Sequence, residues 1–186
     1  MVIGYRLYNK AASPKQVSAE AKNLLLQLVR TYWSADTPPQ HISVDKDSSG
    51  APVLTVDGQP LCCSLTHKSG CIAAAFSATT RIGIDLENLN TDKTYQRIRN
   101  AYRHGFLADT ELTRDAFFYR WTLAEAFAKA SGIPLLEVLE KPLKEQQASA
   151  KYFQIRSFLL CAYQASLPEK SREITLHHLE ADNQRQ

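Results

Sequence analysis

Two short stretches of this sequence place charged side chains at spacings that bring them onto a common face. In the first, "RIGIDLEN" (residues 81–88), apolar residues alternate with Gly83, Asp85 and Glu87, which is the pattern of a β-strand. Successive strand side chains point to opposite faces, so Asp85 and Glu87 lie on the same face, about 7 Å apart. Like charges at this distance repel each other, so this face either meets water or faces a cation.

The second stretch, "WTLAEAFAK" (residues 121–129), predicts a helix in which Trp121, Glu125 and Lys129 share one face because they are four positions apart. Taken alone, Glu125 and Lys129 have a plain interpretation as a surface ion pair worth a few tenths of a kcal/mol. The two strand carboxylates, taken alone, are likewise typical of a solvated strand face. The combination of the two stretches is more specific than either one.

Hydrophobic periodicity and capping signals predict the elements that carry these residues. Long helices are expected over 13–33 and 114–132, with one or two short helices within 93–104. Strands are expected over 2–8, 41–45, 53–57, 61–67, 152–164 and 173–181, and two more over 71–87 with a joint at 78–80. The order strand, helix, strands, helix, strands predicts an α+β fold.

This order also indicates two halves of similar plan, each with one long helix and about three strands. We expect an N-terminal α+β half over residues 1–88 and a C-terminal α+β half over residues 89–186. A chain of 186 residues is long enough for two such tightly packed halves. Together they are expected to form one compact unit with internal pseudo-symmetry.

Composition narrows the class of partner. The net charge of +3 is only mildly basic, and no Lys/Arg block with interleaved aromatic residues favours nucleic acid. A phosphate-bearing cofactor or an acidic protein suits this balance better. No apolar run approaches the ~18 residues of a membrane helix, and no secretory signal is apparent at the N-terminus. The four cysteines lack zinc-ligand spacing, so we expect free thiols in the cytoplasm and no membrane partner.

Three motifs together resemble those of a known family. The G-x-D-x-E strand ending at Glu87, the helix motif from Trp121 to Lys129 and the upstream pair Thr66-His67 are similar to the motifs of the 4′-phosphopantetheinyl transferases. The resemblance is to the longer, pseudo-dimeric type that activates surfactin synthetase and similar enzymes. It covers about residues 50–160 and implies a monomer that folds as an intramolecular pseudo-dimer of two α+β halves.

The resemblance implies a Mg²⁺-dependent enzyme, a holo-[acyl-carrier-protein] synthase. It moves 4′-phosphopantetheine from coenzyme A to a serine of an acyl or peptidyl carrier protein and so converts the apo carrier to the holo form. By this resemblance Asp85, Glu87 and Glu125 hold the Mg²⁺, which suits carboxylates and phosphate oxygens. Glu125 is also the expected general base for the serine hydroxyl.

Contacts to the coenzyme follow from the same resemblance. Lys129 is expected to bind the coenzyme's phosphates and to stabilise or protonate the leaving phosphate. Thr66 and His67 match the pair that contacts the 3′-phosphate. Lys15 and Lys22 in the first helix are candidates for the basic residues that grip the nucleotide end.

Two positions depart from the family pattern. Ala124 stands where a lysine normally precedes the metal-binding glutamate, and Ala51 replaces the lysine of a G-K-P turn. Each lost phosphate contact is expected to weaken coenzyme binding by ~1.5–3 kcal/mol, so the activity is expected to be weak. The alternative is a degenerate, non-catalytic relative that binds a carrier protein or coenzyme A. The three retained carboxylates favour the enzyme, since binding alone does not need them.

The carrier protein needs a docking surface, for which the segment between the two motifs is a candidate. It carries Arg97, Arg99, Arg103 and Arg114. An acidic recognition helix of a carrier is expected to meet such a basic surface.

Overall fold

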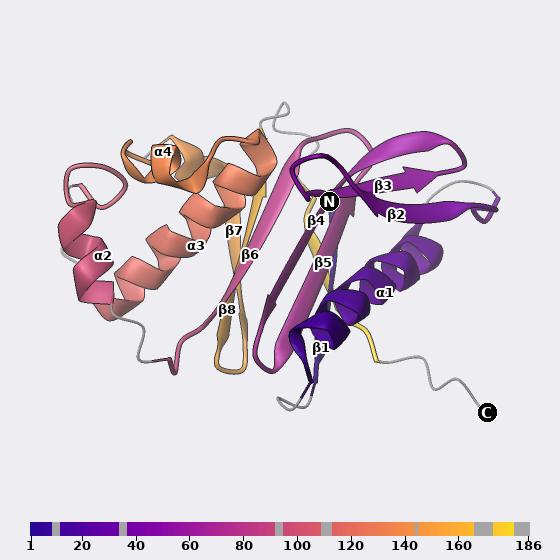
Figure 1. Ribbon diagram of the computed structural model, residues 1–186, viewed down its shortest axis with the longest axis horizontal. Coiled ribbons are helices and arrows are strands. Elements are labelled where there is room, and N and C mark those ends of the chain that lie inside the picture. The colour runs from indigo at the N-terminus through magenta and orange to yellow at the C-terminus, as the bar shows by residue number, and fades with distance from the viewer. Residues whose placement is uncertain are drawn as a thin grey trace. The chain divides into compact units, whose positions relative to one another are not determined.

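The computed structural model of the protein describes residues 1–8, 12–33, 37–91, 95–108, 113–143, 145–165 and 173–180. In this part of the chain nine strands form two sheets, accompanied by four α-helices, which confirms the predicted α+β class (Figure 1). The chain divides into two compact units, Met1–Thr79 with Glu173–Gln186 and Thr80–Arg172. Among the helices in the described ranges, none combines the length and the apolar character that a bilayer crossing requires.

The first unit is a sheet of six described strands with one long helix, α1 (Pro14–Tyr32). Its strand order is β2-β3-β4-β5-β1-β9. The strands are β1 (Val2–Leu7), β2 (Ile42–Lys46), β3 (Pro52–Val56), β4 (Gln59–Lys68), β5 (Cys71–Ser77) and β9 (Thr175–His178). Helix α1 begins as expected, with Ser13 and Gln16 in a capping box and Pro14 in the first turn. Its apolar stripe packs on β1, β4 and β5.

The second unit is a three-stranded antiparallel sheet with order β6-β8-β7. Its strands are β6 (Ile82–Asn88), β7 (Ala150–Ile155) and β8 (Phe158–Gln164), and its helices are α2 (Tyr95–Ala101), α3 (Arg114–Ser131) and α4 (Leu135–Leu139), followed by a 3₁₀ turn (Gln146–Ser149). Helix α3 packs on β6 and β8. It starts at the capping residue Thr113 and ends at Gly132 with φ of 70°, which is the predicted left-handed cap.

The two units share a chain path. In each, a first strand leads toward a long helix, and a later hairpin returns so that its second strand pairs antiparallel with the first strand. In the first unit these elements are β1, α1 and the hairpin β4-β5, and in the second they are β6, α3 and the hairpin β7-β8. The first unit adds β2, β3 and β9 to this common plan.

The bounds of the units differ from the expected halves, 1–88 and 89–186. Strand β6 pairs with β8, so residues from Thr80 onward belong to the second unit, and β9 pairs with β1, so the end of the chain returns to the first. Residues 152–164, expected as one strand, form a hairpin that turns at Arg156 with φ of 53°. No glycine, asparagine or proline marks that turn, so its sequence signal is absent.

Candidate functional site

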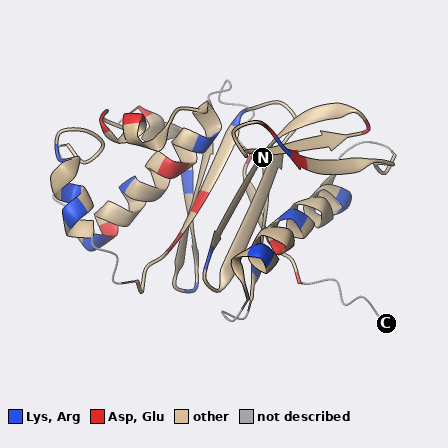
Figure 2. Cartoon of the chain, viewed as in Figure 1, with Lys and Arg blue, Asp and Glu red and all other residues tan. Residues whose placement is uncertain are grey.

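Three carboxylates of the second unit converge on one point. Asp85 and Glu87 lie on β6 and Glu125 lies on α3, and one ligand oxygen from each lies within 4.8 Å of the others. Asp85 is 1% exposed and Glu87 is 2% exposed, whereas Glu125 is half-buried. Figure 2 shows acidic positions on both β6 and α3. The strand carboxylates are therefore not a solvated face, which was the plain interpretation of their spacing.

Close approach of helix and strand produces this convergence. Gly83, Asp85 and Glu87 share the face of β6 that meets α3. Gly83 carries no side chain, and a Cβ built there would overlap the carbonyl oxygen of Ala126 and lie 2.9 Å from the backbone nitrogen of Ala130. The glycine thus lets α3 lie directly on the strand, which brings Glu125 within reach of both strand carboxylates.

Lys129 lies one helical turn after Glu125 and contacts the strand on that side. Its Nζ donates hydrogen bonds of 2.9 Å to Asp85 Oδ1 and 2.9 Å to the carbonyl oxygen of Ile84. The Lys129 side chain is 36% exposed and that of Asp85 is 2% exposed. A buried carboxylate is stabilised by such a partner. Lys129 therefore compensates the charge of one of the three carboxylates.

Trp121 lies one turn before Glu125 and contacts the other strand carboxylate. Its indole Nε1–H donates a 2.9 Å hydrogen bond to Glu87 Oε1. Sequence reasoning placed Trp121 on this face of the helix but missed the bond. Its spacing of four residues before Glu125 is the signal that pointed to it.

Ala124 has a packing role in this structure. It is fully buried and belongs to the apolar core of the second unit with Phe117 and Phe118. A lysine at 124 would have to place its ammonium in that core, where desolvation disfavours a charge. A small side chain therefore fits the packing at this position.

Two titratable groups with shifted pKa values lie on the other strands of this sheet, Cys161 on β8 and Tyr152 on β7. Cys161 on β8 lies directly opposite Asp85 in the pairing of β6 with β8. Burial, and to a smaller extent the charge of Asp85, raises the pKa of the Cys161 thiol. Burial likewise raises the pKa of Tyr152, whose hydroxyl donates to the carbonyl oxygen of Tyr119. Both groups are therefore neutral near pH 7 and add no further charge to the cluster.

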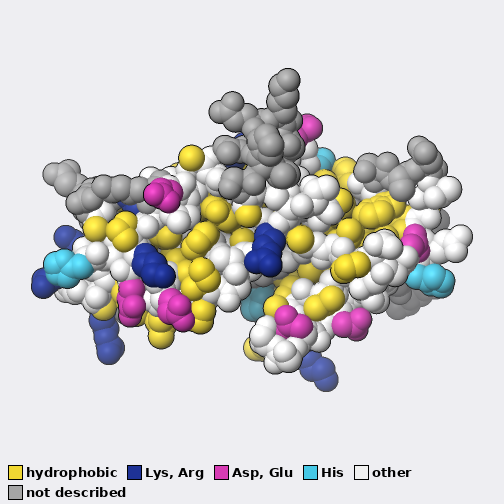
Figure 3. Space-filling model, turned by 90° about the horizontal axis from the view of Figure 1, so that it is seen from above, with side chains coloured by type: hydrophobic (Ala, Val, Ile, Leu, Met, Phe, Trp, Pro, Cys, Tyr) yellow, Lys and Arg dark blue, Asp and Glu magenta, His cyan; other side chains and the backbone are white. Residues whose placement is uncertain are grey.

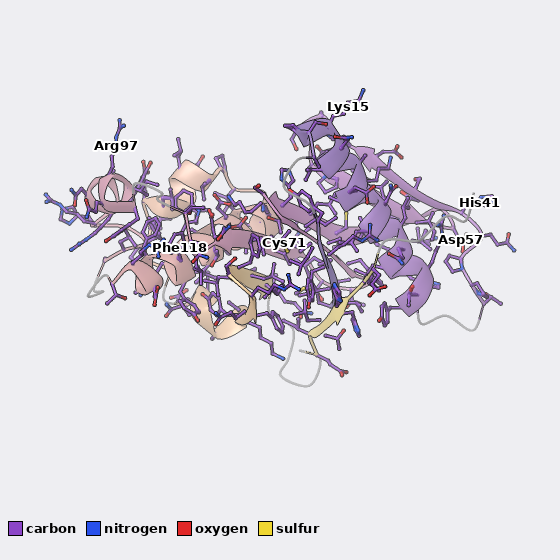
Figure 4. The ribbon with its side chains drawn as sticks, turned by 90° about the horizontal axis from the view of Figure 1, so that it is seen from below. Lys15, His41, Asp57, Cys71, Arg97 and Phe118 are labelled. Carbon is purple, nitrogen blue, oxygen red and sulfur yellow. The ribbon has the colours of Figure 1, made fainter. Side chains whose placement is uncertain are left out.

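A separate hollow of about 700 Å³ lies in the first unit, between α1, β2, the turn at Gly50 and β4. Its basic lining residues are Lys15, Lys22, Lys46 and His67, and Asp45 is its acidic one. All four basic residues are exposed. Figure 4 labels Lys15, which extends outward from α1. The volume lies in the range of small-molecule and cofactor sites.

This hollow brings together residues that the sequence suggested separately. Lys15 and Lys22 lie on one stripe of α1, and His67 reaches the hollow from β4. Thr66 alternates with His67 along β4, is 5% exposed, and is not among the lining residues. The sequence did not point to Lys46. It lies directly opposite Pro52 in the pairing of β2 with β3, which positions it beside the turn at Gly50.

No protein-family model matches this chain, and no curated protein matches it significantly. The family resemblance stated from the motifs therefore stays a prediction. The α+β fold and the geometry of the two sites are the basis on which a function is proposed.

Proposed function

We propose that the protein is a Mg²⁺-dependent 4′-phosphopantetheinyl transferase of the pseudo-dimeric, surfactin-synthetase-activating type. The observation that carries the proposal is the convergence of Asp85, Glu87 and Glu125 from a strand and a helix. The chain path shared by the two units supports the pseudo-dimeric type. The proposal is tested by incubating an apo carrier protein with this protein and coenzyme A and measuring the mass of the carrier by mass spectrometry.

The donor set fits the proposed metal. Three carboxylates offer hard oxygen ligands, and Mg²⁺ binds such oxygens together with water and substrate phosphates. Two of the carboxylates are almost completely buried, and a divalent cation offsets their mutual repulsion. A divalent cation held by Asp85, Glu87 and Glu125 would neutralise charge that develops on the pyrophosphate of coenzyme A as the phosphoanhydride bond breaks.

The reaction assigns roles to residues of the helix α3. The carrier serine Oγ attacks the β-phosphorus of coenzyme A, a new P–O bond forms, and the bond to the α-phosphate oxygen breaks so that 3′,5′-ADP leaves. Glu125 accepts the serine proton, directly or through water, because it is the half-buried member of the cluster and the one on the helix. Lys129, one turn further, stabilises the leaving phosphate while also contacting Asp85.

The hollow of the first unit is the proposed place for the nucleotide end of coenzyme A. Lys15, Lys22 and Lys46 provide three ammonium groups against the single carboxylate of Asp45, and His67 adds a donor. Phosphate groups form charge-assisted hydrogen bonds with such side chains. Lys46 supplies a positive charge beside the turn in which Ala51 stands at the position of the family's lysine.

Lys22→Met and Lys46→Met are each expected to weaken binding of coenzyme A by about ten-fold, since one charge-assisted hydrogen bond contributes ~1.5–3 kcal/mol. Isothermal titration calorimetry at low salt measures the change. Arg30→Met is the matched control, because Arg30 is an exposed cation of the same helix outside the hollow's lining. Equal affinity in all four proteins, wild type included, would remove the coenzyme from this hollow.

A basic surface around α2 is the proposed docking site for the carrier protein. Arg97, Arg99, Arg103 and His104 are exposed there, and residues 95–108 contain no carboxylate. Figure 3 shows basic side chains gathered with a histidine over α2, and Figure 4 shows Arg97 extending from that helix. Arg114 is engaged differently, donating a 2.8 Å bond to the carbonyl oxygen of Thr91. An acidic carrier helix matches this charge.

The double variant Arg99→Glu, Arg103→Glu is expected to raise KM for the carrier by about ten-fold at low salt, because like charges then face each other across the interface. Affinity for coenzyme A should stay at its wild-type value. Steady-state kinetics at varied carrier concentration measures KM for the carrier, and calorimetry measures the affinity for coenzyme A. Lys151→Glu, an exposed charge reversal on β7, serves as control. An unchanged KM in the double variant would rule out α2 as the docking surface.

The proposal includes a cytoplasmic monomer. All four cysteines are free thiols, which agrees with a reducing compartment. The non-catalytic alternative, a protein that binds coenzyme A or a carrier without turnover, rests on Ala51 and Ala124.

A further inference from the structure

We propose that Trp121 is a positioning residue that sets the metal affinity of the carboxylate cluster by orienting Glu87. The inference rests on the proposed metal centre and concerns the hydrogen bond from the indole N–H to Glu87 Oε1. It assigns a function to a side chain that the helix motif otherwise presents as a core aromatic residue.

The bond joins two groups that are almost completely shielded from water. Its length is 2.9 Å, Trp121 is 8% exposed and Glu87 is 2% exposed. A hydrogen bond to an ionised acceptor is stronger than one between neutral groups, and low local dielectric strengthens it further. The indole therefore fixes the direction of one carboxylate oxygen, Oε1.

The donor is itself fixed by aromatic packing. The Trp121 ring stacks on Phe117 with centroids 5.9 Å apart and an interplanar angle of 16°, and it meets Phe106 edge-on at 6.4 Å and 60°. Offset-stacked and edge-to-face contacts of this kind stabilise a defined ring orientation. The N–H direction is thus set by the apolar core and does not depend on a bound metal.

The choice of tryptophan has an electrostatic reason. One turn on either side of Glu125, α3 supplies a donor to a strand carboxylate: Lys129 to Asp85 and Trp121 to Glu87. Lys129 neutralises the carboxylate that it contacts. The indole is uncharged, so it orients Glu87 without adding a positive charge that would compete with a cation. Partners of this kind, which hold metal ligands without touching the metal, commonly change metal affinity by about 10–100-fold.

The test removes the N–H group without changing the shape of the ring. In a Trp33→Phe background, Trp121 is the remaining tryptophan of the two in the chain. A tryptophan-auxotrophic host then replaces it with 3-benzothienylalanine, in which sulfur stands in place of the N–H. Affinity for Mn²⁺, the probe metal, is measured by electron paramagnetic resonance of the free ion, and circular dichroism verifies the fold of each protein.

We expect the analogue to lower Mn²⁺ affinity by about ten-fold or more relative to the Trp33→Phe protein. Glu87→Gln in the same background should also lower it, and adding the analogue to Glu87→Gln should change little more, since Trp121 acts through Glu87. The fluorescence emission of Trp121 in the Trp33→Phe protein should change as Mn²⁺ binds. The midpoint of this change should equal the midpoint measured by electron paramagnetic resonance.

Two outcomes would count against this inference in distinguishable ways. If the Trp33→Phe protein binds Mn²⁺ and the analogue binds it equally well, Trp121 does not position Glu87, and the metal centre stands without it. If neither protein nor the wild type binds Mn²⁺, the metal centre itself is overturned.

Discussion

Glu125→Gln is expected to lower the rate of carrier modification by about a thousand-fold, within the range for loss of a general base, and to weaken metal binding as well. The amide keeps the size of the side chain but cannot accept a proton at neutral pH and carries no negative charge. Both effects act on the point where the helix meets the strand carboxylates. Single-turnover kinetics and Mn²⁺ titration measure the two effects separately.

Glu137→Gln provides the control for this change. Glu137 is an exposed glutamate of α4 in the same unit and is not a member of the cluster. It should retain wild-type turnover and metal affinity. Near-normal turnover of Glu125→Gln would remove Glu125 from the mechanism, even if metal affinity fell.

Gly83→Ala is expected to lower the free energy of unfolding by about 3 kcal/mol or more, the upper range for overpacking a close contact. The added methyl group would overlap backbone atoms of Ala126, and a helix backbone cannot move aside as a side chain does. Displacement of α3 would also carry Glu125 away from the strand. Chemical denaturation measures the stability, and Mn²⁺ titration reports the loss of the cluster.

Gly4→Ala is the matched control because Gly4 also lies in a strand that faces a helix. A Cβ at Gly4 would meet side-chain atoms, with Leu28 Cδ1 at 2.9 Å and Leu179 Cδ1 at 3.0 Å. These tips can shift, so the loss should be clearly smaller than at Gly83. Equal losses at both glycines would contradict the close backbone approach of α3 and β6 as the cause.

The two faces that carry the site's residues follow from periodicity, whereas the meeting of the three carboxylates was expected only from the family resemblance. Alternation along a strand placed Asp85 and Glu87 on one face, and a spacing of four placed Trp121, Glu125 and Lys129 on one face of a helix. Both faces are as expected, and the helix caps at Ser13 and Gly132 are confirmed. These features depend on neighbours in the sequence, so local rules are sufficient for them.

The remaining features depend on contacts between distant residues. The contact of Trp121 with Glu87 and that of Lys129 with Asp85 require knowing how α3 crosses β6, which the missing side chain of Gly83 determines. The grouping of β6 with β8 is likewise a matter of strand pairing, which the strand's own residues do not specify.

In the first unit, alternation along β4 separates His67 from Thr66, although the motif presents them as a pair. His67 lines the hollow with the lysines of α1, whereas Thr66 is buried. The place of Lys46 at the hollow depends on the pairing of β2 with β3.

The central claim is tested most directly by intact-protein mass spectrometry of apo carrier proteins incubated with this protein, coenzyme A and Mg²⁺. The account predicts that a carrier gains the mass of one phosphopantetheine and that excess chelator abolishes the gain. Fatty-acid, polyketide and peptidyl carriers should all be included, together with a transferase of known activity that verifies each carrier. If the control transferase modifies every carrier and this protein modifies none, the proposed transferase activity is contradicted. The alternative, a binding protein without turnover, then takes its place.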